Sequence, residues 1–250
     1  MDKTSIIFVH IGAGNHSIDK EKIYKEAIKR ACIIANEALK LGKPCEKVVE
    51  IAIKSLEDNP ATNAGIGSNL TRNGTVQCDA SIMRSTDGAF GAVGAVSAIK
   101  NPIEAANKLL DFEAKGEDAL GLVPPLENSK EQLESVSDID VFEDTVGAVC
   151  LDFNGNIASG VSSGGIAIKL EGRVGEAAIY KSGCWAQAYN NEGIETVVGS
   201  SVTGNGEQIM RLSVAKKMAK SLSHPEIDPL ESTEKTFSKL LGIFFYTLVF

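Results

Sequence analysis

The spacing of apolar residues predicts helices and strands that alternate along the chain. In residues 20–41, apolar side chains recur every three or four positions, which is typical of an amphipathic helix. Gly42 is suited to end this helix, and Pro44 can open a second one whose apolar positions run from Val48 to Leu56. Residues 5–11 contain a short continuous apolar run at residues 6–9, which indicates a buried strand. We expect both helices to cover one face of a sheet.

The clearest strand pattern lies in the middle of the chain. Residues 145–152 are β-branched or small and apolar, Asn154-Gly155-Asn156 is a turn signal, and residues 157–163 return. This pattern predicts a β-hairpin. An acidic stretch precedes the hairpin, so Thr145 opens a buried strand where an exposed segment ends.

Shorter patterns complete the prediction. Residues 62–68 form a glycine-rich loop that leads into a hairpin of residues 69–83 around Asn73-Gly74. Asn101 and Pro102 have the residue types of an N-cap and first helical position, with the helix ending near residue 115. The remaining expected elements are strands at residues 91–99, 166–169, 177–181 and 196–203, a helix at 206–222 and a polar connection at 224–233.

Composition and charge indicate a globular protein and argue against one class of partner. The chain has 250 residues with 43% hydrophobic and 23% charged side chains, which is ordinary for a globular protein of one or two domains. Its net charge of −8 and the absence of a basic stripe argue against nucleic-acid binding. Residues 117–144 are rich in acidic side chains and are expected to form a solvated linker.

The cysteine spacing and the apolar segments near the two ends of the chain indicate where in the cell the protein is located. The five cysteines have no CxxC spacing, so free thiols in a reducing compartment are expected, and three scattered histidines make a zinc site an unfavoured interpretation. We expect no signal peptide, because the apolar run near the N-terminus is far too short. The apolar residues 240–250 are also too few to span a bilayer, which needs ~20 residues. The expected location is therefore the cytoplasm, the nucleus or both, with no membrane partner.

Thr145 is the candidate nucleophile. If the Asp144–Thr145 bond were cut, one residue would carry both a hydroxyl and a free amine, and the amine could act as the general base for the hydroxyl. A threonine at the start of a strand is also explained by its strand propensity alone. The dipeptide by itself therefore leaves both interpretations open.

The wider sequence resembles a known family. The strings Asp144-Thr-Val-Gly-Ala-Val, Ser162-Ser-Gly-Gly, Gly172-Arg-Val-Gly and Gly183-Cys-Trp-Ala resemble the N-terminal-nucleophile hydrolases of the plant-type asparaginase family, and most of all its threonine aspartase (taspase) branch. The likeness runs from Val9 to about Leu222. It implies an α/β fold, a four-layer αββα sandwich, in one domain of residues 1–250 that self-cleavage divides into segments 1–144 and 145–250.

The resemblance implies roles for individual residues. Thr145 would be the nucleophile and Ser163 a second hydroxyl beside it, while Thr203 and Gly204 resemble the element that binds the oxyanion. Arg173 aligns with the arginine that binds the substrate carboxylate, for which a guanidinium is well suited. Glu176 stands where asparaginases place an aspartate for the substrate amine.

A loop behind the nucleophile completes the implied site. Asn63 and Gly65 belong to the loop that braces the nucleophile in the family. Some members hold this loop around a sodium ion through backbone carbonyls, and the resemblance implies no other cofactor. It also implies self-association as a dimer of cleaved halves.

The resemblance leaves three functions open. Glu176 and Ser163 favour a threonine endopeptidase that cuts protein or peptide substrates after aspartate, whereas Thr203 is the more asparaginase-like residue. The second interpretation is an asparaginase or isoaspartyl peptidase with the same nucleophile; a glycosylasparaginase is a more remote interpretation, because no secretory signal is expected. The third is an inactive relative, because residues 240–250 depart from the family pattern at the C-terminus. Those residues would either pair as a replacement strand or leave the sandwich incomplete and the chain poorly active.

Overall fold

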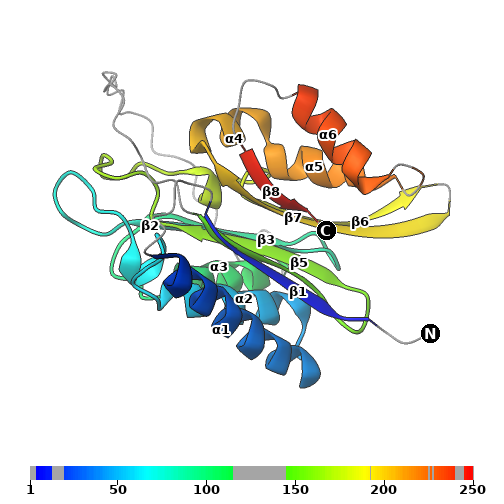
Figure 1. Ribbon diagram of the computed structural model, residues 1–250, viewed down its shortest axis with the longest axis horizontal. Coiled ribbons are helices and arrows are strands. Elements are labelled where there is room, and N and C mark those ends of the chain that lie inside the picture. Colours follow the sequence, from blue (N-terminus) through cyan, green and yellow to red (C-terminus); the bar gives the residue numbers. More distant parts are fainter. Residues whose placement is uncertain are drawn as a thin grey trace.

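Two antiparallel sheets pack face to face with helices on both outer faces (Figure 1). The computed structural model describes residues 4–12, 20–114, 145–191, 193–224, 226, 228–239 and 245–249, with side chains described as far as residue 236. The larger sheet has the strand order β1-β4-β5-β2-β3, and the smaller sheet has the order β6-β7-β8. The predicted four-layer αββα sandwich is therefore confirmed.

The strands are β1 (Ile6–Ile11), β2 (Cys78–Arg84), β3 (Phe90–Val96), β4 (Val146–Leu151), β5 (Ile157–Ser163), β6 (Cys184–Asn191), β7 (Ile194–Gly204) and β8 (Phe245–Val249). The α-helices are α1 (Glu21–Lys40), α2 (Cys45–Glu57), α3 (Pro102–Glu113), α4 (Gly206–Leu212), α5 (Val214–Leu222) and α6 (Pro229–Lys239). Two short 3₁₀ helices, η2 (Gly65–Gly67) and η4 (Glu176–Ala178), lie in loops. Helices α1, α2 and α3 cover the larger sheet, and α4, α5 and α6 lie beyond the smaller one (Figure 1).

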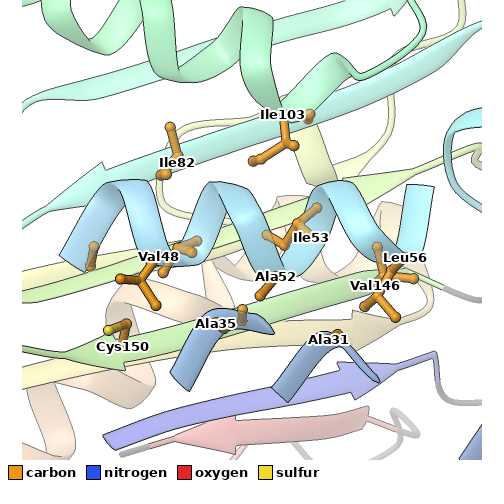
Figure 2. Packing of buried hydrophobic residues seen from close by; sticks show 14 of the residues in the cluster. Ala31, Ala35, Val48, Ala52, Ile53, Leu56, Ile82, Ile103, Val146 and Cys150 are labelled. Atoms are coloured by element: carbon orange, nitrogen blue, oxygen red, sulfur yellow. The ribbon is translucent and has the colours of Figure 1, made fainter. Parts of the chain in front are cut away.

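The central hairpin is built as its pattern predicts. Strands β4 and β5 pair antiparallel with Val146 opposite Ser162, and Gly155 takes the positive φ of 84° that the turn requires. Alternate residues of a strand point to opposite faces, so Val146 and Cys150 pack under α2 (Figure 2). Val149 belongs to the second core cluster, with residues of the smaller sheet. The hairpin thus contributes to both layers of the core.

Helix α1 lies close to α2 through small side chains. Ala27, Ala31 and Ala35 are buried against the core, whereas Ile23 is 46% exposed. Small residues let two helix backbones approach, so the larger isoleucine is left at the edge of the contact. The helix nevertheless has nearly the predicted bounds.

The structure corrects the predicted elements between residues 164 and 183. Residues 166–169 are not a strand, because Ile168 has a φ of +56° that breaks the pleat and only Lys169 makes an isolated bridge, to Thr71. Residues 177–181 are not a strand either, since the chain forms η4 there. Strand β6, which follows, was not among the predicted elements.

Other predicted elements are shorter or differently bounded. The hairpin of residues 69–83 is reduced to one bridge between Leu70 and Val76, followed by β2. The helix predicted at 206–222 is two helices, because Ser213 adopts a left-handed conformation with a φ of 51°. The connection predicted at 224–233 is wrong in its second half, where α6 begins at Pro229. The acidic stretch of residues 117–144 lies outside the described residues.

The N-terminus of α3 shows a different cap from the predicted one. Asn101 occupies the N-cap position, but its amide donates to Asp58 at 3.1 Å instead of capping the helix. The carboxylate of Glu57, at the end of α2, accepts the Ile103 N–H at 3.0 Å. A buried acid from a neighbouring helix therefore caps α3.

The apolar C-terminal stretch supplies an edge strand. Backbone pairing places β8 antiparallel to β7, from Ser200 opposite Val249 to Gly204 opposite Phe245. Residues 245–249 thus form the replacement strand, which was one of the two expected outcomes. Within the ranges that the structure describes, no helix has both the length and the apolar character needed to cross a membrane.

Candidate active site

The hydroxyl of Thr145 lies at the point where the central hairpin meets a loop from the C-terminal half. Thr145 directly precedes β4 and is only 2% exposed, and its backbone carbonyl accepts the Gly12 N–H at 3.0 Å. Ser163 ends β5, the strand paired with β4, so the hairpin register brings the two hydroxyls to 3.3 Å. The predicted juxtaposition of these two residues is therefore observed.

A carboxyl group makes the shortest contact to the candidate nucleophile. Thr145 Oγ1 donates to Glu176 Oε1 at 2.5 Å. Glu176 begins η4 and is buried, and burial raises the pKa of its carboxyl, although the hydroxyl of Thr145 and the charge of Arg173 oppose the rise. A Cβ on Gly206 would lie 2.6 Å from Glu176 Oε2, so glycine at this position makes room for the longer acid.

Arg173 presents one free donor to the same site. Its Nη2 donates to Glu207 Oε1 at 2.7 Å, and its side chain is 16% exposed. Its Nη1 is buried without a hydrogen-bond partner among the described residues. A guanidinium held at one nitrogen and unpaired at the other is suited to bind a carboxylate.

These groups share one small cavity. Its lining comes from the hairpin, the loop after β5, the loop before η4 and the junction of β7 with α4: Thr145, Ser163, Gly165, Ile166, Arg173, Glu176, Gly204 and Gly206. The volume is about 10 Å³, which is the room that one water molecule needs. Gly204 lines the cavity and the buried Thr203 precedes it in β7, while their role as the oxyanion element stays a prediction.

Known proteins match the chain over most of its length. The family model described as Asparaginase (Asparaginase_2) matches residues 3–119 and 122–243. The chain belongs to this family. Bovine isoaspartyl peptidase/L-asparaginase is 36% identical over 236 residues, covering 84% of this chain and 74% of the relative. The plant-type L-asparaginase of Pyrococcus horikoshii is 36% identical over 245 residues, covering 84% and 77%.

Membership in the asparaginase family makes the chain an enzyme, a hydrolase of the N-terminal-nucleophile type. These two relatives carry the names of an isoaspartyl peptidase and an asparaginase, so they support the second function that the sequence left open. They do not support the placement in the threonine aspartase branch. The catalytic roles of the individual residues stay predictions.

The predicted bracing loop of this asparaginase-family chain contacts the turn behind Ser163. The side-chain amide of Asn63 donates to the Gly165 carbonyl at 2.9 Å, and the backbone carbonyl of Asn63 accepts the Gly164 N–H at 2.8 Å. Gly65 is needed as glycine, since it has a φ of +55° and a Cβ there would lie 2.4 Å from the Glu57 carbonyl oxygen. The loop therefore fixes the backbone that carries Ser163.

The backbone carbonyls of this loop are the groups that would bind the expected sodium ion. The Asn63 carbonyl accepts the Gly164 N–H. The Ala64 and Gly65 carbonyls accept the N–H groups of Gly67 and Ser68, respectively. Hydrogen bonds within the protein therefore hold the loop, and the sodium ion stays a prediction. Among the described residues, no three His, Cys, Asp or Glu side chains are grouped to hold a metal.

Two residues that shape the site were not found by sequence reasoning. Asp79 is fully buried in β2, and its carboxylate accepts the N–H groups of Ala95 at 2.7 Å and Gly175 at 2.8 Å. Lys169 is also buried, and its ammonium donates to the carbonyls of Gly164, at 2.8 Å, and Gln77. Asp79 anchors the loop between Arg173 and Glu176, and Lys169 anchors the turn after Ser163. A charged residue inside an apolar run was the available signal for Asp79.

Proposed function

We propose that the chain is an asparaginase-family amidohydrolase that releases Thr145 by self-cleavage of the Asp144–Thr145 bond. Its substrate would be a small β-aspartyl compound, either asparagine or an isoaspartyl dipeptide. The observation that carries the proposal is the contact of the Thr145 hydroxyl with Ser163 and Glu176 in a cavity that Arg173 also lines.

The proposed reaction uses the freed amine of Thr145 as the general base. The amine takes the hydroxyl proton while Oγ1 attacks the substrate carbonyl carbon. The N–H of Gly204 and the hydroxyl of Thr203 would stabilise the oxyanion, by analogy with the family motif. The protonated amine then gives its proton to the leaving nitrogen, so that collapse expels ammonia or an amino acid and leaves an ester on Thr145, which water hydrolyses.

Two groups that line the cavity have the charges that recognise the ends of an amino acid. The unpaired Nη1 of Arg173 is suited to the α-carboxylate, and the carboxyl of Glu176 is suited to the α-ammonium, whose charge would lower its raised pKa. A residue inside a protein chain has neither a free α-carboxylate nor a free α-ammonium. This charge pair, together with the names of the relatives, supports a small substrate.

A threonine endopeptidase cutting after aspartate is the second candidate. Two residues favour it. Glu176 stands where plant-type asparaginases have an aspartate, and Ser163 stands where they commonly have a threonine. In that case Arg173 would hold the aspartyl side chain of the substrate. The dimer of cleaved halves and the cytoplasmic or nuclear location remain expectations for either candidate.

Three substrates discriminate between these functions. The purified chain is first aged at neutral pH and analysed by mass spectrometry, with Thr145→Ala as the control; two pieces that meet at the 144–145 bond are expected only without the substitution. The aged protein is then given asparagine, an isoaspartyl dipeptide and a peptide with one internal aspartate. Release of ammonia or of the second amino acid supports the proposal, and cutting of the peptide supports the endopeptidase. An unmodified chain that stays whole and inactive would contradict both.

A further inference from the structure

We propose that Glu176 is the general base for the self-cleavage step, so that the chain uses one base for its own maturation and another for its substrate. This inference rests on the proposed function, because it concerns the same hydroxyl and the same bond. It assigns to Glu176 a step that precedes any contact with a substrate.

The need for a second base follows from the covalent state of the uncut chain. Before cleavage, the nitrogen of Thr145 belongs to the peptide bond with Asp144, and resonance delocalises its lone pair into the carbonyl group. It therefore cannot accept a proton from its own side chain. The threonine hydroxyl is a weak nucleophile until another group takes that proton.

Glu176 is the described titratable group best placed for this task. Its Oε1 accepts the Thr145 hydroxyl at 2.5 Å, which is at the short end of O–H···O hydrogen-bond distances. Ser163 is farther, at 3.3 Å, and its Oγ already accepts the Gly165 N–H at 3.0 Å. A serine hydroxyl also holds a proton of its own, so it can relay a proton but not retain one.

The other ionisable groups around the site make no hydrogen bond to the Thr145 hydroxyl. His10 Nε2 bonds to Ser201 Oγ at 2.7 Å, and His10 Nδ1 has no hydrogen-bond partner among the described residues. The ammonium of Lys169 donates to two carbonyls, and Arg173 pairs with Glu207. Asp79 accepts two backbone N–H groups. Each of these groups therefore has another partner, and none of these contacts is to the Thr145 hydroxyl.

The proton and bond changes balance within the chain. Glu176 takes the Oγ1 proton while Oγ1 forms a bond to the carbonyl carbon of Asp144. The protonated carboxyl then gives that proton to the Thr145 nitrogen as the C–N bond breaks. The product is an ester between Asp144 and Thr145 Oγ1 with a free amine on Thr145. Water hydrolyses the ester, and Glu176 returns to its starting state.

The length of the side chain at position 176 matters for this contact. Gly206 has no Cβ to collide with Glu176 Oε2, so the longer acid reaches across to Thr145. An aspartate would withdraw the carboxyl by about one carbon–carbon bond, roughly 1.5 Å. The contact to Thr145 would then lengthen beyond hydrogen-bond distance unless the loop moved.

Burial also gives Glu176 a suitable basicity. Its pKa is raised above that of an ordinary carboxyl by desolvation, and the nearby charges of Arg173 and Asp79 act in opposite directions on it. A more basic carboxylate takes a proton from a hydroxyl more readily than an ordinary one does. Because the ionised form is the base, the rate of self-cleavage should rise with pH as Glu176 loses its proton.

The test follows the conversion of the full chain, synthesised and labelled in a cell-free system, into its two pieces. Glu176→Gln should slow self-cleavage at least a hundredfold, the scale of general-base catalysis. Glu176→Asp should also slow it, and the matched control Glu195→Gln, an exposed acid of β7, should cleave at the parent rate. In Glu176→Ala, added formate should restore cleavage in proportion to its concentration, whereas chloride should not.

The outcomes separate this inference from the proposed function. Failure of the parent chain to cleave would contradict the proposed function itself. Parent cleavage with an equal rate in Glu176→Gln would overturn the base while leaving the function intact, and so would a folded Glu176→Ala that formate cannot rescue. If the variants do not fold, the parent alone decides: a cleavage rate that does not fall on acidification, down to the lowest pH at which the parent stays folded, overturns the inference.

Discussion

Replacing Glu57 by glutamine should make the fold less sensitive to alkaline pH. Glu57 is fully buried at the end of α2, where its Oε1 accepts the Ser162 hydroxyl at 2.7 Å and the Ile103 N–H at 3.0 Å. Its Oε2 has no hydrogen-bond partner among the described residues. Burial raises its pKa from 4.5 to about 7, and its hydrogen bonds offset only part of this rise. Glutamine has the shape of the protonated acid and keeps the acceptor.

The magnitude follows from the shift in pKa. The folded chain binds the Glu57 proton more tightly than the unfolded chain, so this contribution to stability is complete below about pH 4.5 and is lost as the pH rises through about 7. At about 1.4 kcal/mol per pKa unit, the loss is on the order of 3 kcal/mol. Glu57→Gln should therefore gain about 3 kcal/mol over the parent between pH 4.5 and pH 8.

Urea unfolding followed by circular dichroism measures this effect. Both proteins carry Thr145→Ala so that the chain stays whole during the experiment. Burial also lowers the pKa of His10 to about 4, which works in the opposite direction over the same range. The informative quantity is thus the difference in unfolding free energy between variant and parent at each pH. For the control Glu26→Gln, at an exposed position of α1, the difference in unfolding free energy from the parent should be the same at every pH. A difference that is also the same at every pH for Glu57→Gln would refute the reasoning.

Two further predictions concern Arg173 and Ser213. Arg173→Lys should lower kcat/KM for the β-aspartyl substrate at least tenfold, because lysine cannot both pair with Glu207 and offer a second nitrogen to a carboxylate; losing such a pair costs about 2–5 kcal/mol, and unchanged kinetics would show that Arg173 is not the carboxylate clamp. Ser213→Gly should raise the unfolding free energy by about 1 kcal/mol, since Ser213 holds a left-handed φ of 51° that glycine adopts without strain. A loss of stability on urea unfolding would count against that strain.

Some elements could be predicted because their signals are local. The period of α1 and α2, the turn at Asn154-Gly155-Asn156 and the alternating faces of the central hairpin need only neighbouring residues. The proximity of Thr145 and Ser163 also follows from the hairpin, because antiparallel pairing fixes the partners once the turn is placed. The resemblance of the short motifs added the fold class and the asparaginase family.

The errors fall where tertiary contacts outweigh local preference. The helix pattern of residues 206–222 is continuous in sequence, yet Ser213 breaks it, and the N–H groups of Ala215 and Lys216 bond to the carbonyls of Ser182 and Lys181. Residues 166–169 have strand-like composition, but Ile168 turns out to solvent while Lys169 bonds to carbonyls inside. A local pattern reports which residues tend to be buried, and not which partners they meet.

The sequence by itself thus determined helices α1 and α2, the central hairpin, the candidate nucleophile and the family resemblance. Only the tertiary structure decided that Glu176, rather than Ser163, makes the closest contact to the Thr145 hydroxyl, and that Asp79 holds the loop that carries it. The reason is physical: these contacts join residues 31 and 96 positions apart through irregular loops. Such loops have no periodicity, so their course depends on which buried polar groups find partners once the two sheets have packed.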